Sequence, residues 1–216
     1  MTAKLKHGIT KVKDPGSALT HFIAMILAII AAMPLLSKAG HDSGHMHISA
    51  LAVFILSMIG LYAASTIYHT LDISPKINKL LRKIDHMMIF ILIAGTYTPV
   101  CMIVLGDKTG WTMLTLVWGI AIVGILINAL WITCPKWFSS LIYIAMGWVC
   151  ILAITKILSS MPRAGFMWLL AGGIIYAMKL PFFNSRHRYF GSHEIFHLFV
   201  MGGSLCHYVM MYRFVA

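Results

Sequence analysis

The sequence predicts an all-α integral membrane protein, a single bundle of seven helices formed by residues 1–216. Hydrophobic residues make up 60% of the chain and charged residues only 11%, whereas ordinary soluble domains are about half apolar and about a quarter charged. Apolar runs of about 20 residues, the length that a helix needs to cross a bilayer, recur along the whole chain. The connections between these runs are short, so we expect no separate soluble domain.

Seven apolar runs account for most of the chain. The polar, basic residues 1–16 precede the first run, unlike the short basic start of a cleavable signal peptide. We therefore expect a cytoplasmic N-terminal segment followed by a first membrane helix. In order, the predicted spans are residues 17–36, 48–71, 84–105, 111–131, 139–158, 165–183 and 192–212.

Local features distinguish several of these runs. The first contains Pro34 near its end, and the third contains Pro99, where we expect a kink because proline removes a backbone hydrogen bond. The fourth and fifth runs are predicted from length and apolar character alone. The sixth and seventh contain the pairs Gly172-Gly173 and Gly202-Gly203, which are predicted to let neighbouring helices approach closely.

The basic residues predict the orientation of the chain. There are 17 Lys and Arg residues against 6 Asp and Glu, a formal net charge of +11. In a membrane protein such an excess reflects cytoplasmic loops and contact with anionic lipid, so we expect lipid and not nucleic acid as the partner. With the N-terminus inside, twelve of the 17 basic residues lie on the cytoplasmic side and five outside. The prediction is a cytoplasmic N-terminus and an external C-terminus.

Three predicted helices bring histidines and a carboxylate to the cytoplasmic membrane level. The second run ends with Ser65 and His69 one turn apart, the third begins near Asp85, and the last begins with His193 and His197. Histidines four residues apart share one face of a helix, a spacing suited to metal ligands. Ionisable residues inside a membrane segment are costly and are candidates for functional sites.

These residues predict a zinc site with His69, His193 and His197 as ligands. Three neutral imidazoles leave one tetrahedral position open for water, whose pKa zinc lowers from 15.7 to about 7. Asp85 is predicted to act as a general base on this water, and Ser65 to orient Asp85 or a substrate carbonyl. Imidazoles also suit other transition metals, and the simpler alternative is that the histidines only form hydrogen bonds between helices.

A rival interpretation comes from the segment His193-Glu194-Ile195-Phe196-His197, which matches the zinc protease signature H-E-x-x-H with Glu as general base. Such proteases usually take their third ligand from downstream, yet no Asp or Glu follows His197. Gly203 occupies the position of the third histidine of metzincins. The third ligand would have to come from upstream, so an intramembrane protease is the less favoured interpretation.

Other histidines and the cysteines are not assigned to this site. His21 and His86 lie at the right depth for supporting or packing roles, whereas His207 is about 21 Å further along its helix than His193. The histidines of the loop at 41–47 are expected to be solvated. The 4 cysteines form no C-x-x-C pair and are expected to be small buried hydrophobic residues.

The sequence resembles the hemolysin III family of bacterial membrane proteins, within the superfamily of the progestin and adipoQ receptors. The resemblance rests on three motifs in order: Ser65 and His69 as S-x-x-x-H, Asp85-His86 with the following residues 94–99, and His193 with His197 as H-x-x-x-H. It implies a seven-helix bundle with a cytoplasmic N-terminus and a zinc ion near the cytoplasmic face. It also implies that the three histidines are ligands and that Asp85 and Ser65 hold water beside them.

The same resemblance frames the functional hypotheses. Eukaryotic members are similar to ceramidases, which implies a zinc-dependent hydrolase of lipid amides or esters in a bacterial plasma (inner) membrane. The alternative is a non-enzymatic protein, either a cytolysin or pore, or a regulator or receptor with a structural zinc. A pore should show a continuous polar stripe along several helices, whereas polar residues here gather at one end. The family varies at Glu194, which argues against its being the general base of a protease.

Overall fold

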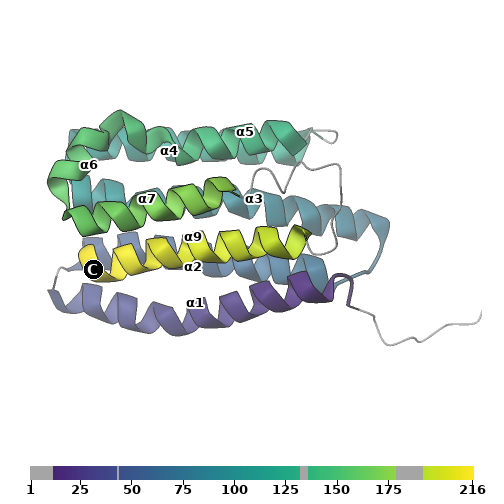
Figure 1. Cartoon of the computed structure of the whole chain (residues 1–216). Helices are drawn as coiled ribbons and strands as arrows, with labels where there is room; N and C mark the ends of the chain where they lie inside the picture. Colours follow the sequence, from purple (N-terminus) through teal and green to yellow (C-terminus); the bar gives the residue numbers. More distant parts are fainter. Residues whose placement is uncertain (1–11, 43, 132–135, 179–191) are drawn as a thin grey trace, which may run out of the picture.

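The computed structural model describes residues 12–42, 44–131, 136–178 and 192–216 and is drawn in Figure 1. Within these ranges the chain forms helices and connecting segments and no strand, so the all-α prediction is confirmed. The α-helices are α1 (Pro15–Asp42), α2 (His45–Thr70), α3 (Pro75–Pro99), α4 (Lys108–Leu130), α5 (Lys136–Gly147), α6 (Ile154–Ser160), α7 (Arg163–Met178) and α9 (Ser192–Phe214).

Among the described residues, six helical segments are long and apolar enough to cross a membrane, so the chain is a multi-pass membrane protein. They correspond to the first five predicted runs and the last one. The sixth predicted run corresponds to α7, which has 16 residues, and its predicted end at residues 179–183 lies outside the described residues. Most of the predicted N-terminal segment 1–16 also lies outside them. The orientation of the two termini stays a prediction.

Helix α3 begins at Pro75, well before the predicted start at residue 84. Ser74 caps this end, because its side chain accepts a hydrogen bond from the Ile77 N–H at 3.3 Å, and proline is favourable at the first helical position. The early turns carry Lys76 and Lys79 among other basic residues. Hydropathy therefore located the apolar part of the helix but not its amphipathic beginning.

The helices lie side by side and surround a common interior (Figure 1). Helix α1 packs against α2 and α9, α2 packs against α3, α3 against α4, and α7 against α9. The first and last membrane helices are therefore neighbours. The beginnings of α1, α3 and α9 and the end of α2 lie at one end of the bundle, and the C-terminus lies at the other (Figure 1).

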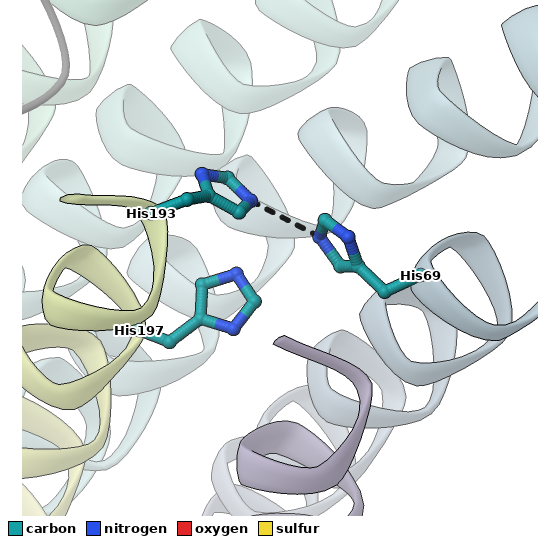
Figure 2. Close-up of side chains that lie close together, drawn as sticks. All are labelled: His69, His193 and His197. Carbon is teal, nitrogen blue, oxygen red and sulfur yellow. Dashed lines mark hydrogen bonds between the residues drawn. The ribbon is translucent and has the colours of Figure 1, made fainter. Parts of the chain in front are cut away.

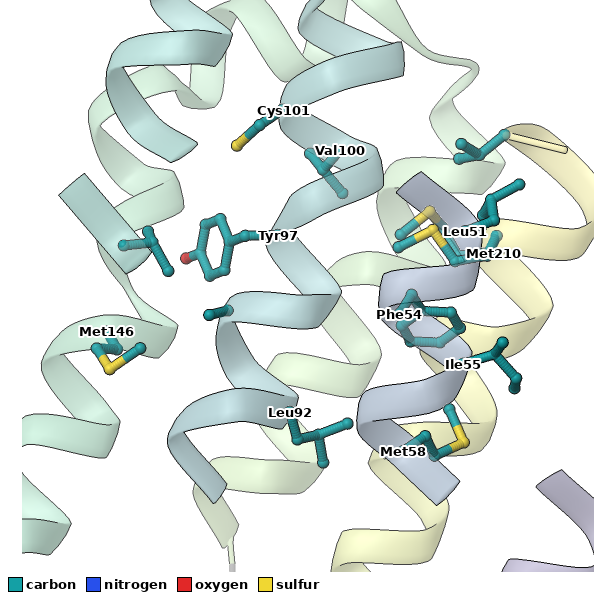
Figure 3. Packing of buried hydrophobic residues seen from close by; sticks show 14 of the residues in the cluster. Leu51, Phe54, Ile55, Met58, Leu92, Tyr97, Val100, Cys101, Met146 and Met210 are labelled. Atoms are coloured by element: carbon teal, nitrogen blue, oxygen red, sulfur yellow. The ribbon is translucent and has the colours of Figure 1, made fainter. Parts of the chain in front are cut away.

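The core is built from apolar side chains on α2, α3 and α9, including Phe54, Leu92 and Met210 (Figure 3). Gly95 and Gly172 mark two close helix approaches, since a Cβ would collide with Ser57 at the first and with His207 at the second. The close packing predicted for the pair Gly172-Gly173 is thus confirmed at Gly172, whereas a Cβ at Gly173 would meet no neighbour. Large apolar side chains also cover the outside of the bundle, as expected of a surface that faces lipid.

Two membrane helices are irregular. After Pro99, α3 continues as a π-helix over Val100–Leu105, so the predicted proline irregularity takes this form. The fifth span breaks between α5 and α6 into a short 3₁₀-helix. Here the Tyr97 hydroxyl donates to the Gly147 carbonyl and accepts from the Cys150 N–H, both at 2.9 Å. Tyr97 on α3 therefore satisfies backbone groups that the break would leave unpaired.

The connection to α4 is closed by an ion pair at the end of the bundle opposite to the start of α1. Asp107 caps α4 by accepting hydrogen bonds from the backbone N–H groups of Thr109 and Gly110 at 3.1 and 3.2 Å. Lys156 of α6 donates to the Asp107 carboxylate and to the Thr109 hydroxyl. This hydrogen-bonded ammonium lowers the pKa of the Asp107 carboxyl from its ordinary value.

Candidate metal centre

Three histidines from two helices lie together at the end of the bundle where α1 begins (Figure 2). His69 is in the last turn of α2, and His193 and His197 are one turn apart at the start of α9. One ring nitrogen from each residue lies within 4.8 Å of the others. The Nε2 atoms of His69 and His193 are 3.2 Å apart. This group could hold a metal ion, as the spacing of the histidines in the sequence suggested.

Asp14, which the sequence did not mark as a site residue, contacts the Nδ1 side of the His69 ring. The Asp14 carboxylate lies 3.0 Å from Nδ1 of His69, and the Asp14 N–H donates to the His69 carbonyl at 2.9 Å. A carboxylate that accepts from Nδ1–H fixes the ring so that Nε2 faces the other two histidines. Histidines that bind metals in proteins commonly have such a partner on the second nitrogen.

Thr20 holds His197 in a similar way. Its hydroxyl lies 3.2 Å from Nδ1 of His197 and 3.0 Å from the carbonyls of Gly16 and Ser17. Because the hydroxyl hydrogen can be donated to a carbonyl, the oxygen is available to accept from Nδ1–H of His197. The Nε2 atom of this buried ring is then free to act as a ligand.

The N-terminal residues that precede α1 are fixed against the end of α2. The Lys13 ammonium lies 3.6 Å from the centre of the Tyr68 ring and 3.5 Å from the Tyr68 carbonyl. The Lys13 N–H also donates to the Thr70 carbonyl at 3.4 Å. These contacts place Asp14 beside His69, and a cation over an aromatic face is itself favourable. No motif in the sequence marked this pairing, because its partners are 55 residues apart.

The histidine cluster lies at one end of an interior cavity of about 800 Å³. The same cavity is lined at its polar end by Ser65 and Asp85 and further along by apolar residues such as Ile93, Val100 and Ile157. The helix from Asp85 to Val100 corresponds to roughly 22 Å of length. The interior therefore combines a polar end with a long continuation that is mainly apolar but also contains Thr96, Tyr97 and His207.

Ser65 and Asp85 line the same cavity as His69, and their predicted roles stay predictions. Ser65 is buried one turn before His69, and its side chain interacts with the Asp85 carboxyl group. The Asp85 carboxylate also lies 4.0 Å from Nδ1 of His86, but it is not one of the clustered ligand atoms. This placement allows Asp85 to act beside an ion while the three imidazoles hold it.

The remaining histidines have different surroundings. Nδ1 of His86 lies 2.6 Å from the Arg82 carbonyl, and Nε2 of His207 lies 3.3 Å from the Leu169 carbonyl. His21 stacks on His197 with ring centres 3.7 Å apart and planes at 9°, and neither of its nitrogens has a hydrogen-bond partner. Among the described cysteines, Cys101 and Cys206 are buried and all three are free thiols, while Cys134 lies outside the described residues.

The cluster does not have the arrangement of the H-E-x-x-H proteases. Its third histidine, His69, comes from upstream of the motif and from another helix. The Glu194 side chain points toward Gly16 at the start of α1, so it lies against the first helix. This geometry favours an upstream ligand set over the protease interpretation.

Fold and site together define a class: helical multi-pass membrane proteins in which histidines from separate helices could hold a metal ion inside the bundle. A family model described as "Haemolysin-III related" matches residues 9–208. The chain belongs to this family, as its sequence motifs indicated.

Curated relatives agree with this assignment. "Hemolysin-3" of Bacillus cereus is 40% identical over 205 residues, covering 94% of this chain and 93% of the relative. "Hemolysin-3 homolog" of Bacillus subtilis (strain 168) is 36% identical over 192 residues, 89% of each chain. A more distant relative is the human "Monocyte to macrophage differentiation factor", 24% identical over 167 residues, 76% of this chain and 69% of the relative.

Proposed function

We propose that this protein is a zinc-dependent hydrolase of lipid amides or esters, with the ion held by His69, His193 and His197. One observation carries the proposal. The three histidines lie at the polar end of an interior cavity of about 800 Å³ whose other walls are largely apolar. A metal-activated water and a largely apolar space for an acyl chain are the two components that such a reaction requires.

The residues present fit a zinc ion. Nitrogen ligands lie 2.0–2.1 Å from zinc, so two of them on a tetrahedral ion are about 3.4 Å apart. The 3.2 Å separation between the Nε2 atoms of His69 and His193 is close to this value. Asp14 and Thr20 occupy the Nδ1 sides of His69 and His197, which leaves Nε2 of both rings for the ion. Bound zinc would supply a water of lowered pKa and polarise a carbonyl group.

Asp85 is the proposed general base and acid. It lines the cavity beside the histidine cluster, and Ser65 interacts with its carboxyl group. A carboxylate in this position can accept a proton from the attacking water and return it to the amine or alcohol that leaves. Ser65 orients this carboxylate, or donates to the substrate carbonyl.

The acyl chain of the substrate would extend from the histidines along the apolar part of the cavity. Roughly 22 Å of α3 separates Asp85 from Val100, and both residues line the cavity. Cavities of 300–1,000 Å³ are typical of small-molecule sites in proteins. Substrate in this position would come from the surrounding membrane, so lipid is both environment and substrate.

The proposed orientation has the N-terminus in the cytoplasm and the C-terminus outside, in a bacterial plasma (inner) membrane. The support is the distribution of basic residues, twelve of 17 on the side of the N-terminus. This places the histidine end of the bundle at the cytoplasmic face.

A second candidate is a non-enzymatic role as a cytolysin or as a receptor with a structural metal. Relatives carry the name "Hemolysin-3". The three histidines belong to α2 and α9, so an ion bound to them would link these two helices. The polar residues of the described cavity do not all gather at one end, as the sequence suggested, because Thr96, Tyr97 and His207 also line it. Most of the lining is apolar, however, which favours the hydrolase over a water-filled pore formed by one chain.

The test is hydrolysis of lipid amides and esters by the purified protein in nanodiscs, with metal content measured on the same sample. The proposal expects about one zinc per chain and release of free fatty acid that disappears when a chelator removes the zinc. Zinc without any hydrolysis would favour the structural role. Leakage from pure-lipid vesicles that survives loss of all three histidines would favour the cytolysin.

A further inference from the structure

Two polar side chains on α1 have no partner although they are buried beside the histidine cluster. Ser17 and His21 are one turn apart, with 1% and 3% of their surfaces exposed. The Ser17 hydroxyl and both ring nitrogens of His21 make no hydrogen bond. Both residues line the interior cavity. The great majority of buried polar groups in proteins are paired, so three unpaired atoms on one helix face need an explanation.

The contrast with the neighbouring histidines is direct. His69 has Asp14 on its Nδ1 side and His197 has Thr20, so the fold provides partners for the two rings that are proposed to bind metal. It provides none for His21, whose ring is stacked on that of His197 at 3.7 Å. The missing partner is therefore expected to enter from the cavity, directly beside the proposed metal ligand.

The geometry points to a hydrogen-bonding subsite formed by Ser17 and His21. This subsite would hold the polar group that neighbours the carbonyl of a bound ligand. This inference rests on one part of the proposed function, namely that a lipid occupies the cavity. The subsite adds the requirement that this lipid both donates and accepts hydrogen bonds beside Ser17 and His21.

The chemistry of the two side chains sets that requirement. A neutral imidazole has one N–H donor and one acceptor nitrogen, and a serine hydroxyl both donates and accepts. A lipid amide with an N–H group and a nearby hydroxyl can satisfy all of these groups at once. A simple ester has no hydrogen to donate, so it would leave an acceptor of the subsite unpaired inside the bundle. The subsite therefore favours hydroxylated lipid amides over simple esters.

Two probes of equal chain length test this preference, N-dodecanoylethanolamine and 2-methoxyethyl dodecanoate. The first has an amide N–H and a hydroxyl, and the second replaces both with groups that cannot donate. Equilibrium binding is measured by calorimetry on the zinc-loaded full chain carrying Asp85→Asn in nanodiscs, so that neither probe is hydrolysed during the titration. We expect this chain to bind the amide at least about tenfold more tightly than the ester, because a site built for an N–H or O–H donor rejects an analogue without one.

Variants identify the residues responsible. His21→Phe and Ser17→Ala should each weaken amide binding, by about tenfold and about threefold, and leave ester binding unchanged. His21→Gln, which retains a donor and an acceptor, should keep most of the preference even if His21→Phe folds poorly. His45→Phe and Ser49→Ala make the same kinds of change on exposed residues at the far end of α2, so they should alter neither affinity.

Each other outcome overturns a distinct claim. Equal affinities for the two probes when Ser17 and His21 are unaltered, or a preference that survives in both His21→Phe and Ser17→Ala, would overturn the subsite and leave the hydrolase proposal intact. Loss of zinc in His21→Phe and His21→Gln would show that His21 belongs to the metal centre and overturn its role as a ligand contact. Absence of binding by either probe would overturn the lipid cavity and, with it, the subsite.

Discussion

The two ends of the helix bundle use polar residues in opposite ways. At the end where α1 finishes and α4 begins, polar groups pair with one another: Lys156 donates to Asp107, and Lys38 donates to the Tyr212 carbonyl at 2.7 Å. At the other end, His69 and His197 are held by partners on one ring nitrogen only. Their second nitrogens point toward a shared space (Figure 2).

This difference separates groups that stabilise connections from groups that are available for chemistry. At the far end these pairs cap helices and close loops, although Nδ1 of His47 is buried there without a partner. At the histidine end, several buried ring nitrogens and the Ser17 hydroxyl remain available together, which is costly unless an ion or ligand completes them. The convergence of several such groups, and not one unpaired atom alone, marks the candidate site.

The largest effect is expected from removing the three histidines. The triple variant His69→Ala, His193→Ala, His197→Ala should lower zinc from about one ion per chain to nearly none, since no other described group of three such ligands converges. Elemental analysis of the purified protein measures this. The matched control replaces His41, His45 and His47 with alanine at the other end of the bundle. Equal zinc loss in both variants would erase the distinction between the two ends.

The next effect concerns turnover without loss of metal. Asp85→Asn should keep most of the zinc and reduce lipid hydrolysis by about 10²–10⁴-fold, because a positioned general base contributes that much. Rates of fatty-acid release measured together with metal content separate the two properties. Asp72→Asn, at an exposed position between α2 and α3, is the control. A wild-type rate in Asp85→Asn would remove Asp85 from the chemistry.

Asp14 offers a sharper test, because its carboxylate holds the His69 ring and is not itself one of the clustered ligand atoms. Asp14→Ala should weaken zinc binding by about 10–100-fold, the usual cost of removing the partner of a metal-binding histidine. Competition with a chromogenic chelator gives the affinity. Asp14→Glu keeps a carboxylate and should recover much of it. Unchanged affinity in the alanine variant would mean that the Asp14 contact has no role at the metal.

A smaller effect on stability is expected at the break in the fifth span. Tyr97→Phe removes a hydroxyl that bonds to the Gly147 carbonyl and the Cys150 N–H. The two backbone groups would be left unpaired, at a cost of about 1–3 kcal/mol. Thermal unfolding in detergent should show the loss, with zinc content unchanged. Equal melting temperatures would indicate that water replaces the hydroxyl.

The smallest effect concerns the ion pair at the far end. The pKa of Asp107 is lowered by its hydrogen bond to Lys156, so this pair stabilises the fold above the ordinary carboxyl pKa. The contribution is lost as the pH falls through the lowered pKa. Lys156→Met should therefore flatten the fall in melting temperature as the pH drops below about 4, the ordinary pKa of an aspartate. Because the pair is exposed, added salt should reduce the difference between the variant and the wild-type protein.

Much of the architecture could be predicted from the sequence, because membrane helices are defined by local composition. Six of the seven predicted runs are helices long enough to span a membrane. The early start of α3 at Pro75 could not be found from hydropathy, since basic residues occupy its first turns. The convergence of His69 with His193 and His197 was predicted from helix order and depth, and the structure brings them together.

The supporting residues were not predictable in the same way. Asp14 and Thr20 belong to α1 or its approach, and their histidine partners are 55 and 177 residues away. The sequence showed only an acidic residue before a proline and a threonine in an apolar run. Which of these would meet a histidine depends on how the helices pack, and no local pattern encodes that arrangement.

The contact between Thr20 and His197 has a consequence for biosynthesis. Its two residues belong to the first and last of the described helices, 177 residues apart. A growing chain presents Asp14, Thr20 and His69 early, but it lacks two of the three clustered histidines until α9 is made. The centre is therefore assembled only after α9 has been synthesised, and a chain terminated before α9 would insert into the membrane without it.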